Sequence, residues 1–185
     1  MDVSTPQDLI DFWTGAGAKA WFRVDPTFDA AMRDRFEATH LAASRGELDG
    51  WSQSGDGALA LVLLLDQAPR NIYRGSAHAF ATDGLARAVA AEAIDAGFDR
   101  AAPVDLQIFF YLPFEHAEDA AAQQRALALF EDHATRAGDS EYLRYARVHA
   151  DVIASFGRFP HRNLVLGRTT TPEEAAFLAK GGFSG

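Results

Sequence analysis

The sequence contains no cysteine among its 185 residues, which excludes disulfide bonds, thiolate nucleophiles and cysteine-ligated zinc or iron–sulfur centres. Long apolar runs are also absent, because the longest, residues 58–65, is far shorter than the roughly 20 residues of a membrane-spanning helix. No stretch is long, polar and rich in glycine or serine, as an interdomain linker would be. These absences predict one domain, residues 1–185, with no membrane partner.

Positive charge is scarce. The chain has 17 Lys and Arg against 26 Asp and Glu, which gives a net charge of -9 and a pI near 5.0. Nucleic-acid binding needs a basic face that neutralises phosphates, so this balance predicts no nucleic-acid partner. The first residues show no basic stretch followed by an apolar core, and we therefore expect a cytoplasmic location. The sequence carries no signal for the oligomeric state.

Motifs for metals and cofactors are missing as well. No two histidines stand four residues apart, and the glycine patterns of phosphate loops, dinucleotide sites and nucleophile elbows do not occur. We therefore predict no metal and no cofactor. A metal site would require the fold to bring together side chains that are distant or unpatterned in sequence, the candidates being Glu115, His116, His149, Asp151 and His161.

Helical periodicity runs through the whole chain, and no alternating run typical of a strand is long enough to count. Capping residues followed by proline mark helix starts at Thr5-Pro6, Asp25-Pro26 and Thr171-Pro172. The loops between helices are short, which favours antiparallel neighbours. The sequence predicts an all-α fold of about eight or nine helices arranged as stacked antiparallel hairpins.

Two strings gather arginine, asparagine and histidine beside a proline. The first arginine string is residues 66–75 (DQAPRNIYRG), and the second runs from residue 156 to 168, opening with FGRFPHRN. Each proline is expected to end an apolar helix and to hold the backbone still. Arginine forks bind carboxylates and phosphates, so we predict a pocket for a small anion or an acidic peptide, lined by Arg70, Asn71, Arg74, Arg158, His161, Arg162 and Asn163.

Three functions remain open. In the favoured one, the protein is a binding module whose arginine–histidine pocket holds the anionic ligand, because no self-sufficient catalytic set is visible. In the second, it is an enzyme such as a hydrolase, with Glu115 beside His116, with His116 or His161 as general base, and with arginines stabilising negative charge. In the third, the strings are purely structural, and arginines neutralise Asp66 or Glu115 inside the fold.

We expect the two strings and the segment 111–116 to meet at one side of the helical stack. In that arrangement Arg70 or Arg158 pairs with Asp66 or Glu115, His116 or His161 lines the same cavity, and Arg162 faces outward. His149 shares a helical stripe with apolar residues, which is typical of a core histidine.

Several motifs, in this order along the chain, resemble the bacterial family called domain of unknown function 924. They are Asp11-Phe12-Trp13, Trp21-Phe22, residues 46–51 (GELDGW), 63–75, 111–116 (YLPFEH) and 156–163. The resemblance covers nearly the whole chain, with Ala68 a departure where the family is expected to carry a larger apolar residue. It implies a tetratricopeptide-like superhelix of helical hairpins, and it implies no activity.

Overall fold

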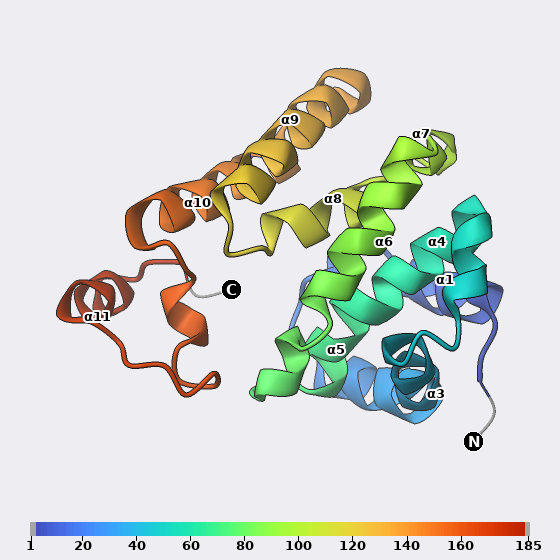
Figure 1. Cartoon of the computed structure of the whole chain (residues 1–185), viewed down its shortest axis with the longest axis horizontal. Helices are drawn as coiled ribbons and strands as arrows, with labels where there is room; N and C mark the ends of the chain where they lie inside the picture. The colour runs from blue at the N-terminus through green and yellow to red at the C-terminus, as the bar shows by residue number, and fades with distance from the viewer. Residues whose placement is uncertain (1–2, 184–185) are drawn as a thin grey trace. The chain divides into compact units, whose positions relative to one another are not determined.

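A computed structural model describes residues 3–183 (Figure 1). Every regular element in this range is helical, which confirms the predicted all-α class. None of these helices is long and apolar enough to cross a membrane. The expected number of helices corresponds to those of eight residues or more, namely α1, α3, α4, α6, α8, α9, α10 and α11.

The contacts group the chain into two compact units, residues 1–113 and 114–185, named here the first and second units. The first unit contains α1 (Pro6–Ala16), α2 (Ala18–Trp21), α3 (Pro26–Ser44), η1 (Asp49–Gln53), α4 (Gly55–Val62), η2 (Leu63–Gln67), α5 (Ala68–Ile72), η3 (Ala77–Phe80), α6 (Asp83–Asp95) and α7 (Phe98–Ala101). Helix α8 (Ile108–Glu115) spans the boundary. The second unit contains α9 (Ala120–Ala137), α10 (Glu141–Phe156), η4 (Pro160–Arg162) and α11 (Pro172–Ala179).

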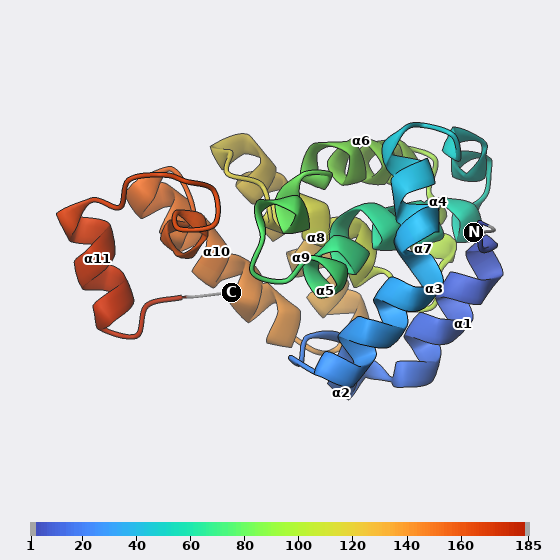
Figure 2. The ribbon, with the colours of Figure 1, turned by 90° about the horizontal axis from the view of Figure 1, so that it is seen from below.

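The first unit is built around α4, whose residues 57–62 are all buried. Its strongly apolar sequence has no polar face to turn to water, so neighbours must cover it on every side. Helices α1 and α6 pack against α4, and α3 packs against its continuation through η2 and α5 (Figure 2). The first arginine string therefore begins inside the core of this unit.

The apolar helix does not end at the proline of the first string, contrary to the prediction. It continues from α4 through the π-helical segment η2 into α5, where Pro69 occupies the first turn. The amide of Ala68 donates to the carbonyl of Leu63, five residues earlier, which is the π-type bond. Pro69 thus lies inside a continuous helix, directly after the π-type turn.

Pro69 has no N–H that could donate to a buried carbonyl of the preceding turn. A residue at position 69 would donate to Leu65 in an α-helix, or to Leu64 in a π-helix. Side chains from other segments supply these bonds instead. His40 Nδ1 donates to the Leu64 oxygen at 2.8 Å, and Thr82 Oγ1 donates to the Leu65 oxygen at 2.6 Å.

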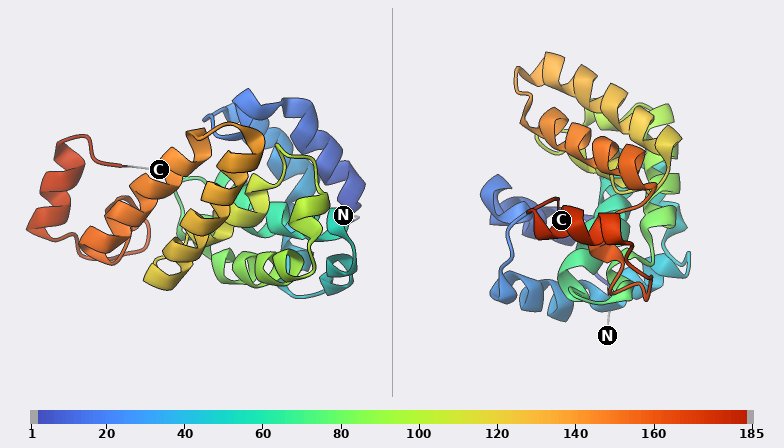
Figure 3. Two further views of the ribbon diagram at one scale, coloured as in Figure 1. Left: turned by 90° about the horizontal axis from the view of Figure 1, so that it is seen from above. Right: turned by 90° about the vertical axis from the view of Figure 1, so that its left-hand side faces the viewer.

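The second unit contains the predicted helical hairpin in its simplest form. Helices α9 and α10 lie side by side and antiparallel (Figure 3), joined by a turn in which Gly138 has φ 70°. Gly157 ends α10 with φ 69°, a left-handed conformation that other residues adopt at a cost. Helix α11 begins with the expected capping box, in which Thr171 and Glu174 bond to each other's backbone amides.

Local turns and caps determine where three further helices begin. Ser76 caps only the short 3-10 segment η3, and α6 begins at Asp83. Pro103 opens a turn rather than a helix, so that α8 begins at Ile108, and Pro113 lies inside α8 near its end. Helix α9 is capped by Asp119, so Glu118 lies just before the helix and binds Arg168 instead.

Replacing Thr82 by valine tests the side-chain bond to the π-segment. The substitution keeps the side chain's shape but removes the hydroxyl that donates to the buried Leu65 oxygen at 2.6 Å, and Thr82 makes no side-chain capping bond that would be lost as well. An unsatisfied buried carbonyl costs about 1–3 kcal/mol, so T82V should lower the free energy of unfolding by that amount in urea denaturation.

The matched control is T14V, which removes an exposed hydroxyl bonded to the Ile10 carbonyl within α1 of the same unit. It should change the free energy of unfolding by less than about 0.5 kcal/mol. Equal effects of the two substitutions would show that the π-segment does not depend on Thr82.

Candidate functional site

The arginines of the first string are matched by carboxylates within the first unit. Arg70 Nη1 lies 3.4 Å from Asp66 Oδ1, one of the ion pairs expected from the sequence. The same guanidinium binds both oxygens of Asp83 at 3.0 and 3.1 Å. Its charge is therefore balanced by two neighbouring carboxylates.

Asp29 of α3 holds the rest of this string. Arg74 reaches its two carboxylate oxygens at 2.7 and 3.0 Å, and Asn71 Nδ2 donates to Oδ1 at 2.8 Å. Burial alone would raise the pKa of Asp29, but the hydrogen bonds from Arg74 and Asn71 lower it below its usual value. Arg74 and Asn71 thus join α5 and the turn after it to α3.

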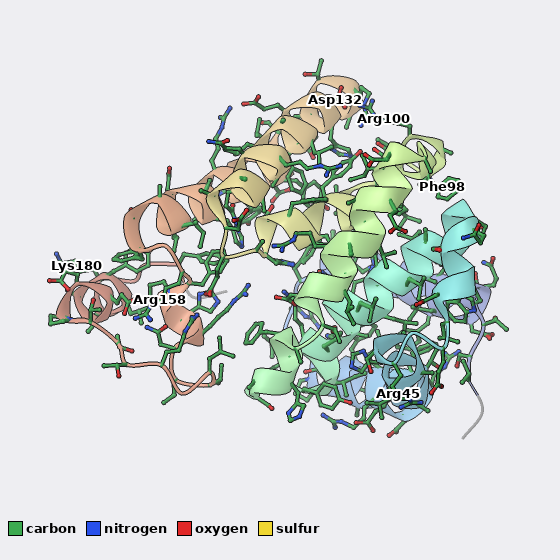
Figure 4. The ribbon with its side chains drawn as sticks, in the orientation of Figure 1. Arg45, Phe98, Arg100, Asp132, Arg158 and Lys180 are labelled. Carbon is green, nitrogen blue, oxygen red and sulfur yellow. The ribbon has the colours of Figure 1, made fainter. Side chains whose placement is uncertain are left out.

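The second string is anchored in the same way on α11. Arg158 Nε and Nη2 reach the two oxygens of Glu174 at 2.6 and 2.8 Å, and Asn163 Nδ2 adds a bond at 3.0 Å. Figure 4 shows Arg158 beside α11. The pKa of Glu174 is lowered to about 2, chiefly by Arg158, with the amide of Thr171 and Asn163 contributing in the same direction.

Arg168 completes this network. Its Nη1 and Nη2 bind Glu118 at 2.6 and 3.0 Å, while Nε donates to Asn163 Oδ1 at 3.0 Å. Glu118 also accepts the backbone N–H of Phe159 at 2.8 Å. Arg70, Arg74, Arg158 and Arg168 therefore form internal ion pairs.

The expectation that Arg162 faces outward was wrong. Its exposed fraction is 6%, and its guanidinium carbon lies 4.5 Å from the ring centroid of Phe159. The ring gives the cation a favourable surface as it leaves water. Asn163 is buried as well, so these two residues of the second string lie in the interior of their unit.

A carboxylate–histidine pair stands apart from the arginine networks. Glu115, the last residue of α8, and His149, in the middle of α10, are both buried in the second unit. Glu115 Oε1 lies 2.9 Å from His149 Nδ1, and the carbonyl oxygen of Tyr145 lies 2.9 Å from the same nitrogen. Both neighbours are acceptors, so we assign the proton to Nδ1 and the lone pair to Nε2.

His116 joins this pair to form a group of three. One ligand atom from each of Glu115, His116 and His149 lies within 4.8 Å of the other two, and the rings of the two histidines are 6.1 Å apart. We name these residues the Glu–His–His cluster. His116 is more exposed than its two partners, and no other such group of three occurs within residues 3–183.

His161 lies at the edge of the cluster. The ring of Phe183 is 4.3 Å from the His149 ring and 5.3 Å from the His161 ring, centroid to centroid. His161 Nδ1 is buried without a hydrogen-bond partner among the described residues. Burial, followed by the positive charge of Arg162, lowers the pKa of His161 to about 4, so this imidazole is neutral at physiological pH.

Spacing along the chain does not reveal the Glu–His–His cluster. The one Glu-x-x-His spacing, Glu37 and His40, leads elsewhere, since His40 donates to the Leu64 oxygen of η2. Asp151, also considered as a ligand, is exposed on α10 and is not a member of the cluster. The adjacent Glu115 and His116 were visible as candidates, and only tertiary packing adds His149.

The two strings belong to different units, so their meeting in one pocket stays a prediction. The partners that the sequence did not indicate are Asp29, Asp83 and Glu174. Each comes from a helix start, where an acidic residue in the first turn is ordinarily explained by the helix dipole alone. No local signal distinguishes such a residue from one that also binds an arginine.

Comparison with known proteins places the chain among proteins without an assigned activity. The model of a family described as bacterial protein of unknown function (DUF924) matches residues 9–182. A solved structure of a protein of unknown function from Agrobacterium tumefaciens is similar, with 52% sequence identity and a TM-score of 0.89. The match covers 95% of this chain and 97% of that one. The comparison with curated proteins finds no significant match.

The lowered pKa of His161 predicts a pH-dependent stability. Between about pH 6.5 and pH 4 the unfolded chain takes up a proton at this imidazole and the folded chain does not. The free energy of unfolding should therefore fall as the pH is lowered through this window, by at most about 1.4 kcal/mol per pH unit from this group. Burial lowers the pKa of His40 as well, which acts in the same direction.

Urea denaturation of the wild type and H161Q, followed by circular dichroism at pH 7, 6 and 5, measures the share of His161. The variant should lose less stability on acidification than the wild type. Parallel curves would mean that His161 is protonated in the folded protein as readily as in the unfolded chain.

Proposed function

Because the chain belongs to the DUF924 family of bacterial proteins of unknown function, we propose its function from the side chains of the second unit. We propose that the protein is an enzyme, a hydrolase in which His149 is the general base and Glu115 orients it. The observation that carries this proposal is the 2.9 Å contact between Glu115 Oε1 and His149 Nδ1. A neighbouring carboxylate and imidazole are the groups that such catalysis requires.

The contacts of His149 support the role of a base. Nδ1 donates to the Tyr145 carbonyl and lies 2.9 Å from Glu115 Oε1, so the ring is held in one orientation and Nε2 keeps its lone pair. When Nε2 takes up a proton, the buried carboxylate stabilises the resulting imidazolium. A surface histidine that turns freely has neither advantage.

His161 has a complementary role in the proposal. A neutral imidazole carries one N–H, and its pKa of about 4 keeps His161 in that form at physiological pH. Neutral imidazole can donate a hydrogen bond to an oxygen that becomes negative in the transition state. His161 and His116 are both more exposed than His149, so they form the side from which a substrate would approach.

The proposed reaction is hydrolysis of an ester by a water molecule. His149 Nε2 accepts a proton from water while the water oxygen bonds to the electrophilic carbon of the ester. The carbonyl electrons move to the oxygen, where His161 donates a hydrogen bond. As those electrons return, the bond to the alcohol oxygen breaks, and this oxygen takes the proton from His149.

The alternative of an anion-binding module has less support. It depended on arginines that are available to a ligand, and Arg70, Arg74, Arg158 and Arg168 are matched by carboxylates at 2.6–3.4 Å. Arginines paired in this way favour the third possibility, in which the strings are purely structural. Glu115 is different, because its partner is a histidine that can exchange a proton.

The first test measures hydrolysis of p-nitrophenyl acetate by the wild type, H149Q and E115Q. General-base catalysis contributes about 10²–10⁴-fold, so H149Q should lower kcat/KM by that factor, and E115Q should lower it by at least tenfold. The matched control is H78Q, which changes an exposed histidine of the first unit and should keep the wild-type rate. Equal rates for wild type and H149Q, including the absence of hydrolysis in both, would overturn the proposal.

A second measurement examines the same pair without a substrate. In the wild type, ¹⁵N NMR of the imidazoles should show His149 with a protonated Nδ1 and a bare Nε2, and E115Q should broaden or mix the two tautomers. A wild-type His149 with the proton on Nε2 would contradict the proposed base.

A further inference from the structure

We propose that the Glu–His–His cluster is a binding site for a divalent transition-metal ion of the zinc class. The proposal goes beyond the proposed hydrolase and does not rest on it, because an ion can bind whether or not His149 transfers protons. Metal binding and proton transfer use the same side chains, so they are alternative states of one cluster.

The donor set is the first support. Two imidazoles and one carboxylate are borderline ligands that suit Zn²⁺ and its neighbours, and the chain has no thiolate to compete for the ion. Two histidines with one glutamate also form a donor set used by catalytic zinc sites. Harder ions such as Mg²⁺ prefer sites made of oxygen alone, and the cluster contributes only the carboxylate of Glu115.

The distances are the second support. Ligands about 2.0–2.2 Å from a tetrahedral ion lie roughly 3.3–3.5 Å from one another. In the cluster one donor atom from each residue lies within 4.8 Å of the donor atoms of the other two. Small side-chain rotations would bring the three atoms around one ion.

Burial and surroundings are the third support. Glu115 and His149 are 3% and 7% exposed, so packing holds them in place, while His116 is partly exposed and leaves one side open. An open side permits a water molecule as fourth ligand, the arrangement that distinguishes catalytic from structural zinc. His149 Nδ1 also lies 2.9 Å from the Tyr145 carbonyl, an outer partner typical of metal-bound histidine.

Isothermal titration of chelator-treated full-length protein with ZnCl₂ tests the site. We expect one equivalent of Zn²⁺ to bind and the melting temperature to rise in its presence. Loss of an outer-shell partner already weakens metal binding about 10–100-fold, so loss of a ligand in H116Q should weaken it at least as much. H78Q, with all three ligands intact, should bind as the wild type does. Unchanged affinity in H116Q, or no binding by the wild type, would overturn the metal site.

The two proposals can fail separately. H116Q keeps Glu115 and His149, so it should retain the His149 tautomer seen by NMR while losing zinc. Ester hydrolysis by the chelator-treated protein reports on the general base, and the titration reports on the ion. Circular dichroism of each variant shows whether it has folded, and H116N replaces H116Q if the latter has not.

Discussion

A carboxylate buried in a protein must be matched by donors, and this requirement organises both units. Leaving one such charge without its partner costs about 3–5 kcal/mol. Asp29, Asp66 and Glu174 are all buried, and each is met by an arginine of one of the two strings. Arginine suits the task because its fork binds both oxygens at once. The arginines of the two strings therefore neutralise the buried carboxylates of both units.

Glu115 is the informative exception to this arrangement. It is 3% exposed, and the partner found for it within the second unit is His149 rather than an arginine. An arginine keeps its charge at every physiological pH, whereas a histidine can gain or lose a proton or bind an ion. Glu115 is thus paired with a side chain whose protonation state can change. The other three carboxylates are paired with arginines, whose charge is fixed. This contrast separates the candidate site from the structural networks.

The sequence predicted what depends on neighbours along the chain. Caps with proline at Thr5 and Asp25 and the fully apolar α4 follow from local rules, and the structure shows them. The contacts that the sequence did not predict depend on tertiary packing. Nothing near Glu174 in sequence indicates that Arg158, 16 residues away, will bind it, and nothing near His149 indicates Glu115. Candidate residues could be named, but their partners could not.

The outcome for Pro69 shows how a local rule can be correct and still mislead. Proline does remove a backbone donor, and this ordinarily ends a helix. Here the helix continues because His40 and Thr82 donate to the carbonyls that Pro69 cannot serve. Both donors come from other helices or their caps, 24 and 17 residues away from the carbonyls that they reach.

The continuous helix from α4 to α5 consequently depends on hydrogen bonds from residues outside it. A peptide spanning Gly55–Ile72 would lack the side-chain bonds to the Leu64 and Leu65 carbonyls, which form only when α3 and the start of α6 have docked. Formation of the central helix and assembly of its neighbours are then one cooperative event. Such coupling makes the first unit resistant to partial opening, since separating α3 from the centre also removes a hydrogen bond from the helix within it.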